Sequence, residues 1–379
     1  MKIQKIELRT VEIPYVTPFE TSFGREEKNQ EVIIRLQSSD IEGFGECVAL
    51  DKPYYSYETV QTEWHILRDF IIPEVKNTEV ETPQDIQSIF KRIRGHYMAK
   101  AGVEEALWDL FAKEKNVSLS KFLGGFKTKT KTKTKTKTKT KTKIDSGVSI
   151  GIDKMEVLLD NISKKWGEGY KRIKIKIKPG WDVHVVKRIR KEFGDIPLMV
   201  DANAAYTLEH LNVMKELDQY NLMMIEQPLH YDDLYDHAVL QKELKTPVCL
   251  DESVKSIKDV ELALKIGSCR IINIKHGRVG GLQKSKEMHD LCLKNDIPVW
   301  AGGMLEFGIG RATNIALASL EGFSLPNDIS ATDRYYKEDI TSPFVLNDDG
   351  TITVPDKAGI GVDIKEDRLE KYTLKKKWF

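Results

Sequence analysis

The chain has 379 residues, 40% apolar and 31% charged, which is enough apolar side chain to bury a large core and excludes global disorder and collagen-like repeats. Its formal net charge of +1 argues against a protein built mainly to hold nucleic acid. By length we expect two or three domains, or one large barrel with an accessory domain.

The four cysteines show no CxxC pair and no short spacing, so a reducing compartment fits better than a disulfide framework. The first residues lack the apolar core of a signal peptide, and the sequence has no run of about 18 apolar residues. We therefore expect a soluble, cytoplasmic protein that does not enter a membrane.

Residues 1–126 begin with strands and continue with helices. The β-branched run at 31–36 and a second run at 41–50, joined through a turn, predict paired strands. Helical periodicity then covers residues 57–70, 83–93 and 100–113. Strands first and helices afterwards predict an α+β domain.

Lysine and threonine alternate from Lys127 to Lys143. Without these nine lysines, 50 Lys and Arg stand against 58 Asp and Glu, so the rest of the chain is mildly acidic. The tract has no apolar side chain to bury, and we interpret it as a solvated linker. The alternative is an arm that binds anions or RNA, with salt-dependent binding that disappears when the tract is removed.

Residues 144–339 alternate short β-rich runs with helical stretches. The β-rich runs lie at 147–152, 172–177, 197–203, 222–228, 247–253, 270–275 and 298–303. Each unit of about 25 residues has the size of a βα step, which predicts a parallel α/β barrel with strands buried on both faces. We expect the tail at about 340–379 to pack back on the first domain.

Charged residues interrupt these runs at a regular spacing. Lys176, Asp201, Glu226, Asp251 and Lys275 are separated by 25, 25, 25 and 24 residues, each at or next to the C-terminal end of a run. Strand ends of this kind form the active-site face of a barrel. A single charge at a strand end is usually just solvated, but five in register with the repeat predict a site.

The three carboxylates of this series need a cation to offset their repulsion if they are buried together. Oxygen ligands favour a hard ion, Mg²⁺ or Mn²⁺, over zinc. Asn203 lies two residues past Asp201, on the same side of the strand end, and is placed to assist.

The lysines indicate the chemistry. Lys174 shares a strand face with Lys176, and a neighbouring cation lowers the pKa of a lysine from about 10.4 toward that of a useful base. A base beside a metal suits removal of a proton α to a carboxylate, with the metal stabilising the enediolate. Lys176 and Lys275 flank the carboxylates and address opposite faces of one carbon. The expected partner is a small-molecule carboxylate.

Other signals are weaker. GVSIG at 147–151 matches the hydrolase nucleophile elbow, but a hydrolase leaves the charge series unexplained, and Ser149 is expected to line the barrel interior. His276 is turned to the other side of the strand from Lys275, and we interpret it as structural. Backbone groups at Gly303 and Met304 either hold a substrate carboxylate or form a plain turn. No nucleotide-binding glycine motif is present.

Longer segments resemble the enolase superfamily, and within it the group of o-succinylbenzoate synthases and N-acylamino acid racemases. The segments that carry the resemblance include GFGECVA (43–49), MAKAGVEEALWDL (98–110), KRIKIKIKPGWD (171–182), VDANAAYT (200–207), IEQPL (225–229), LDES (250–253), NIKHGRVGGL (273–282), GGMLEFGIGR (302–311) and LPNDISATDRYY (325–336). The resemblance covers most of the chain. It implies a (β/α)7β barrel related to the TIM barrel, with an N-terminal α+β capping domain, and homo-oligomers are common in the group.

The resemblance implies a site in which Asp201, Glu226 and Asp251 bind Mg²⁺ and Lys176 and Lys275 serve the two faces of the substrate. Substrate contacts are expected from Lys174, Ser149, Asn203, Gly303 and Met304, and from Phe23 and Tyr55 in the capping loops 19–24 and 48–57. The implied reaction is dehydration of 2-succinyl-6-hydroxy-2,4-cyclohexadiene-1-carboxylate to 2-succinylbenzoate in menaquinone synthesis. Racemisation of N-acylamino acids is the alternative, followed by muconate cycloisomerase and dipeptide epimerase chemistry.

The Lys-Thr tract departs from the group, whose members have a short linker there. The tract precedes the first barrel strand and so lies at the N-terminal face, where we expect it to leave the active site intact.

Overall fold

The structure is a computed structural model that describes residues 1–124 and 140–379. Most of the predicted linker at 127–143 therefore lies outside the described residues. Within the described parts of the chain, no helix combines the length and apolar character needed to cross a membrane.

The N-terminal part is a four-stranded antiparallel sheet covered by helices. Its strands are β1 (Lys5–Glu20), β2 (Arg25–Ser38), β3 (Ile41–Cys47) and, from the other end of the chain, β13 (Thr373–Trp378), in the order β13-β1-β2-β3. Its helical elements are α1 (Val60–Ile66), a π turn (Leu67–Ile71), α2 (Ile72–Val75), a 3₁₀ turn (Pro83–Ile86), α3 (Gln87–Phe90), α4 (Tyr97–Glu114) and α5 (Leu119–Leu123). The helix expected at 83–93 is thus shorter and starts as a 3₁₀ turn.

Helix α4 lies directly on β3, and two glycines make this possible. A Cβ at Gly43 or Gly45 would overlap the backbone oxygen of Ala106 or Gly102 on α4. The helix is buried from Met98 to Ala112, including Glu104, Glu105 and Asp109. Their carboxylates accept hydrogen bonds from backbone N–H groups, which is how buried acids are tolerated.

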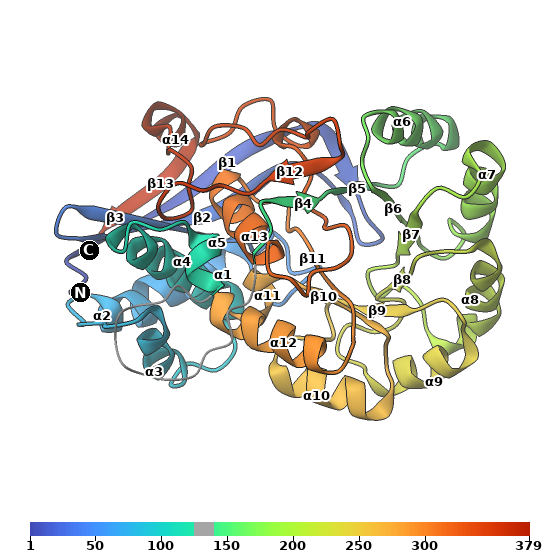
Figure 1. Cartoon of the computed structure of the whole chain (residues 1–379), viewed down its shortest axis with the longest axis horizontal. Coiled ribbons are helices and arrows are strands. Elements are labelled where there is room, and N and C mark those ends of the chain that lie inside the picture. Colours follow the sequence, from blue (N-terminus) through green and yellow to red (C-terminus); the bar gives the residue numbers. More distant parts are fainter. Residues whose placement is uncertain (125–139) are drawn as a thin grey trace.

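The second part is a curled parallel sheet with helices on its outer side (Figure 1). The strands run in sequence order: β5 (Gly147–Ile150), β6 (Arg172–Lys176), β7 (Leu198–Asp201), β8 (Ile225–Glu226), β9 (Val248–Leu250), β10 (Ile271–Ile274) and β11 (Val299–Ala301). The helices between and after them are α6 (Met155–Gly167), α7 (Val183–Phe193), α8 (Leu211–Leu217), α9 (Tyr235–Glu243), α10 (Ile257–Ile266), α11 (His276–Val279), α12 (Leu282–Lys294) and α13 (Gly308–Ala318), with 3₁₀ turns at Leu208–His210, Asp218–Tyr220 and Thr332–Arg334. All residues of these strands are buried.

An irregular segment at 323–329 runs between the two ends of this sheet. Ser324 and Asp328 donate backbone hydrogen bonds to Val299 and Ala301 of β11, at 3.2 and 2.9 Å. On the other side Gly147 of β5 donates to the carbonyl of Asn327 at 2.7 Å. The predicted fold class is confirmed: a mixed α/β protein with a curled parallel sheet and a strand-rich N-terminal part.

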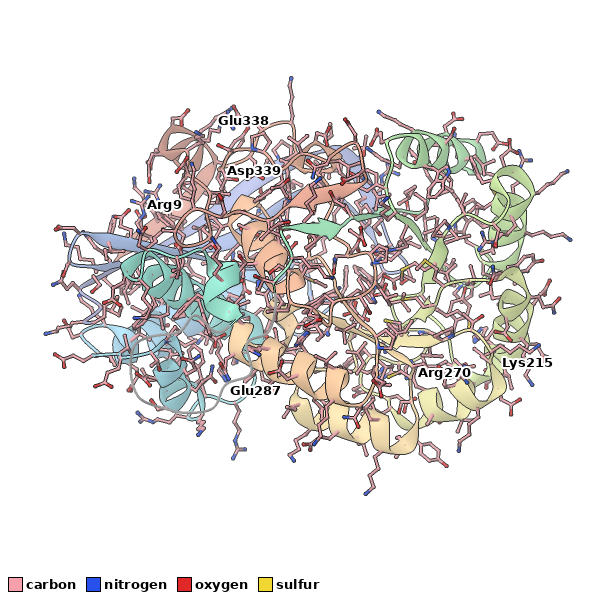
Figure 2. The ribbon with its side chains drawn as sticks, in the orientation of Figure 1. Arg9, Lys215, Arg270, Glu287, Glu338 and Asp339 are labelled. Atoms are coloured by element: carbon pink, nitrogen blue, oxygen red, sulfur yellow. The ribbon has the colours of Figure 1, made fainter. Side chains whose placement is uncertain are left out.

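The C-terminal residues return to the beginning of the chain. β12 (Thr351–Thr353) pairs with β4 (Lys143–Asp145), and α14 (Glu366–Tyr372) leads into β13. Arg9 on β1 donates to Glu370 of α14 at 2.6 Å (Figure 2). The domain limits at 126, 143 and 339 stay predictions.

Candidate active site

The five charges of the sequence series meet at the C-terminal ends of adjacent strands. Parallel pairing in register places Lys176 beside Asp201 and Asp201 beside Glu226. Asp251 and Lys275 follow directly on β9 and β10. All five side chains are buried, and so is Lys174. The regular spacing therefore becomes proximity, because neighbouring strands of a parallel sheet end at one edge.

Lys174 lies at the centre of the carboxylates. Its Nζ is 2.7 Å from Asp328, 3.1 Å from Glu226 and 3.4 Å from Asp201. Burial acts to lower the pKa of Lys174, but these three carboxylates raise that pKa well above its usual value. Lys174 is therefore a fixed positive charge and not a proton acceptor.

Lys176 is held by the next strand. Its Nζ donates to Asp201 Oδ2 at 2.6 Å and to Asn203 Oδ1 at 2.8 Å, and Asn203 in turn donates to Glu252 at 3.0 Å. Asn203 has a left-handed backbone, with φ of 44°. Burial favours the neutral acid at Asp201, but Lys176 and Lys174 outweigh it and keep the pKa of Asp201 below its usual range.

Lys275 occupies the opposite side. Its Nζ is 2.8 Å from Asp251, donates to the Tyr55 hydroxyl at 3.0 Å and lies 3.6 Å from the sulfur of Met304. The Tyr55 hydroxyl itself donates to Asp251 at 2.9 Å, and Arg278 also contacts Asp251. Burial opposes the charge on Lys275, but Asp251 and Tyr55 raise its pKa above the ordinary value.

The three carboxylates suit a hard divalent cation in their chemistry. Burial and the neighbouring Asp201 raise the pKa of Glu226 to about 8, which is the repulsion that such a cation would offset. In the described residues, however, no group of three or more His, Cys, Asp or Glu side chains is spaced to hold a metal as it stands. Lysine ammonium groups lie within 3.4 Å of the carboxylate oxygens instead.

The predicted substrate-binding residues fall into two sets. Asn203 touches Lys176, Tyr55 and Met304 touch Lys275, and Ser149 pairs with Lys174 on the adjacent strand. Gly303 lies against the backbone of Asp328, next to this centre. Phe23 lies farther out, with its ring 6.4 Å from that of Tyr54, although its neighbour Ser22 reaches the carbonyl of Asn203.

Four residues of the site were missed from the sequence. Asp328 lies on the irregular segment 323–329, which lacks the alternation of a strand, so nothing marked its end. Glu252 directly follows Asp251, and Arg278 follows Lys275 by three residues, so both could have been found from their neighbours. Asn273 donates to Glu226 at 2.7 Å from within β10, where a buried asparagine in an apolar run was the available signal.

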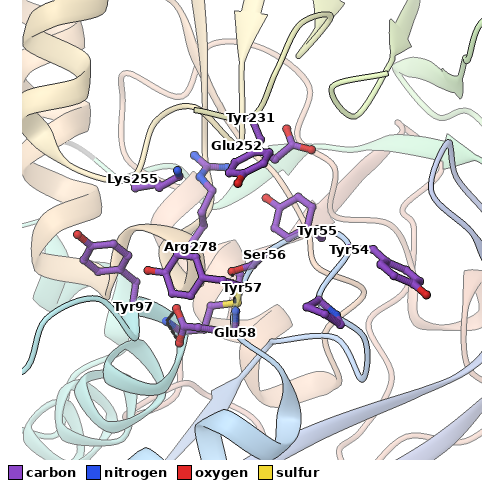
Figure 3. A pocket seen from close by; sticks show the side chains of 12 residues that line it. Tyr54, Tyr55, Ser56, Tyr57, Glu58, Tyr97, Tyr231, Glu252, Lys255 and Arg278 are labelled. Atoms are coloured by element: carbon purple, nitrogen blue, oxygen red, sulfur yellow. Dashed lines mark hydrogen bonds between the residues drawn. The ribbon is translucent and has the colours of Figure 1, made fainter. Parts of the chain in front are cut away.

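A cavity of about 280 Å³ adjoins the site under the capping loop (Figure 3). Its walls include Tyr55, Tyr57, Tyr97, Tyr231, Lys255 and Arg278. Tyr55 and Arg278 also contact Asp251, so they separate this cavity from the carboxylates.

Comparison with known proteins gives a consistent result. Residues 5–124 match the mandelate racemase / muconate lactonizing enzyme N-terminal domain, and residues 158–368 match the enolase C-terminal domain-like family. The chain is 47% identical to the o-succinylbenzoate synthase of Geobacillus stearothermophilus, over 98% of this chain and 96% of that protein. It is 42% identical to an N-succinylamino acid racemase of Amycolatopsis, over 100% and 99%. A crystal structure of an enolase superfamily member from Listeria innocua superposes with a TM-score of 0.92 at 43% identity, covering 100% of this chain and 98% of that one.

Proposed function

We propose a function from the premise that the chain belongs to the enolase superfamily, in the group of o-succinylbenzoate synthases and N-succinylamino acid racemases. The resemblance drawn from the sequence is thereby confirmed. The activity we propose is that of an o-succinylbenzoate synthase, a lyase that removes water from 2-succinyl-6-hydroxy-2,4-cyclohexadiene-1-carboxylate to give 2-succinylbenzoate. Relatives that are 44–47% identical over nearly the whole chain support it.

The reaction needs one base and one stabilising charge on opposite sides of the substrate. Lys176 takes the proton α to the carboxylate and delivers it to the departing hydroxyl, so that one C–H and one C–O bond break and water leaves. Because a single amine serves both steps, proton and hydroxyl leave from the same face. Lys275, on the other face, stabilises the negative charge that develops on the carboxylate oxygens.

Mg²⁺ is part of this proposal, with Asp201, Glu226 and Asp251 as its ligands. It would supply positive charge where the substrate carboxylate becomes an enediolate. Lys174 keeps its charge throughout and orients Glu226 and Asp201. The observation that carries the proposal is the pair of buried lysines, Lys176 and Lys275, on either side of the carboxylates.

Racemisation of N-succinylamino acids is the second candidate. Two lysines on opposite faces can remove and return a proton in either direction, and relatives at 41–42% identity carry this name. The muconate cycloisomerase and dipeptide epimerase alternatives have no such support among the relatives above 40% identity. We also propose that the enzyme works in menaquinone synthesis, in the cytoplasm and as a homo-oligomer.

The test follows the absorbance of the cyclohexadiene carboxylate with purified enzyme and Mg²⁺, then with EDTA, then with Lys176→Ala. We expect metal-dependent turnover that falls by at least about 1,000-fold in the variant. Lys178→Ala is the matched control, because Lys178 is half-exposed and pairs only weakly with Glu20 at 3.4 Å. Absence of turnover by folded, Mg²⁺-loaded protein overturns the synthase assignment and makes racemisation the next assay.

A further inference from the structure

A buried histidine lies directly beside Lys275. His276 begins α11 and is 1% exposed, and it faces α4 of the N-terminal part and α13 of the barrel. Its Nε2 contacts the carboxylate of Glu105 on α4, and its Nδ1 lies 2.7 Å from the side-chain oxygen of Asn314 on α13. The imidazole thus joins two parts of the molecule at the end of the strand that carries Lys275.

Hydrogen-bond accounting fixes the charge of this imidazole. The amide nitrogen of Asn314 donates to Glu306 at 2.7 Å, so its oxygen is the atom that faces His276. Both ring nitrogens therefore face acceptors, and both must carry hydrogen. Burial opposes the charge, but Glu105, Glu306 and Asn314 raise the pKa of His276 to about 9.

The network continues to the side chain of Lys275. Glu306 accepts a hydrogen bond from the backbone N–H of Met304 at 2.8 Å, and the Met304 sulfur lies 3.6 Å from Lys275 Nζ. His276 therefore acts on Lys275 through the adjoining backbone and through Met304. The contacts of Lys176, with Asp201 and Asn203, involve none of these groups.

Several other acids face this imidazole or its partners. They are Glu105 on α4, Glu46 on β3, Glu31 on β2 and Glu306 before α13. Glu46 accepts the backbone N–H groups of Phe307 and Gly310 at 2.7 and 2.8 Å, and its own N–H donates to Glu105 at 2.9 Å. A neutral imidazole would leave this acidic cluster without its buried cation.

We propose that His276 is a positioning residue for Lys275: its imidazolium fastens α4 to the end of β10 and holds Lys275, but not Lys176, in place. This inference rests on the proposed function, in which the two lysines have separate roles. A residue that acts only through Lys275 must lose its effect when Lys275 is absent.

The test is a double-mutant cycle on dehydration by the Mg²⁺-loaded enzyme, with His276→Gln, Lys275→Ala and the double variant. We expect His276→Gln to lower kcat about 10-fold to 100-fold with KM within about 2-fold. In the Lys275→Ala background the same change should alter kcat by less than about 2-fold. Equal losses in both backgrounds, or no loss in either, overturn the inference. A wild-type enzyme without turnover overturns the proposed function instead, and with it this inference.

Two further measurements guard against a variant that fails to fold. Glu105→Gln keeps the size of the side chain and should reproduce the effect of His276→Gln. Titration of His276 by NMR in the wild-type protein should give a midpoint near pH 9. A midpoint near the ordinary value of about 6.5 overturns the inference without any variant.

Discussion

Lys174→Met removes the central ammonium of the site and keeps a side chain of similar length. Lys174 Nζ has carboxylates at 2.7, 3.1 and 3.4 Å, and its side chain is 3% exposed. At an effective dielectric constant of about 20, each such contact is worth about 5 kcal/mol before desolvation and carboxylate repulsion are subtracted. Measured losses on breaking a buried pair are about 3–5 kcal/mol. Because Glu226, whose pKa is already about 8, can take up a proton, we expect about 3 kcal/mol.

The assay is urea unfolding in EDTA at pH 7.5, with Lys178→Met as the control. Lys178 lies four residues along the same strand end, its side chain is 40% exposed and its ion pair with Glu20 is 3.4 Å long, so its loss should cost less than about 1 kcal/mol. Saturating Mg²⁺ should narrow the gap between Lys174→Met and wild type, because a divalent cation replaces the missing charge. Equal stabilities of the two variants in EDTA would refute the reasoning.

Three more predictions concern the interface and the second lysine. Tyr55→Phe removes the hydroxyl between Lys275 and Asp251 and should lower kcat about 10-fold at unchanged urea midpoint, since a hydrogen bond to a charged group is worth about 1.5–3 kcal/mol; an unchanged kcat contradicts this. Glu46→Gln sets an amide N–H₂ against backbone donors and should cost about 2 kcal/mol of unfolding free energy, measured by urea titration, and wild-type stability would argue against the assigned contacts. The raised pKa of His276 adds stability that is complete below about pH 6.5 and is lost as pH rises through about 9, so the stability gap between wild type and His276→Gln should shrink by about 3 kcal/mol between pH 6 and pH 10; a constant gap speaks against a charged imidazole.

The sequence predicted much of the barrel and the charged centre because one periodicity governs both. A repeat of about 25 residues brings the strand ends to one edge, and a charge placed at the same point of each unit must lie near its neighbours. Asp201 and Glu226 were predictable for this reason, as register pairing places them side by side.

What could not be predicted comes from segments outside the repeat. Asp328 reaches Lys174 from a segment that forms few ladder hydrogen bonds and has no strand-like pattern. The contact between Tyr55 and Lys275 joins residues 220 positions apart, which local propensity does not report. The pairing of His276 with Glu105 has the same origin, because it depends on how α4 docks on the barrel.

The pairing of β13 with β1 has a consequence for synthesis on the ribosome. The register joins Glu7 to Trp378 and Val11 to Thr373, so the outer edge of the first strand made is covered by the last residues made. Both chain ends lie on the same side of the molecule (Figure 1). Throughout elongation β1 therefore presents an open edge, which is a template for pairing with other chains. Release of the finished chain is the step that closes this sheet, and a truncation that removes β13 keeps the nascent state's exposed edge permanently.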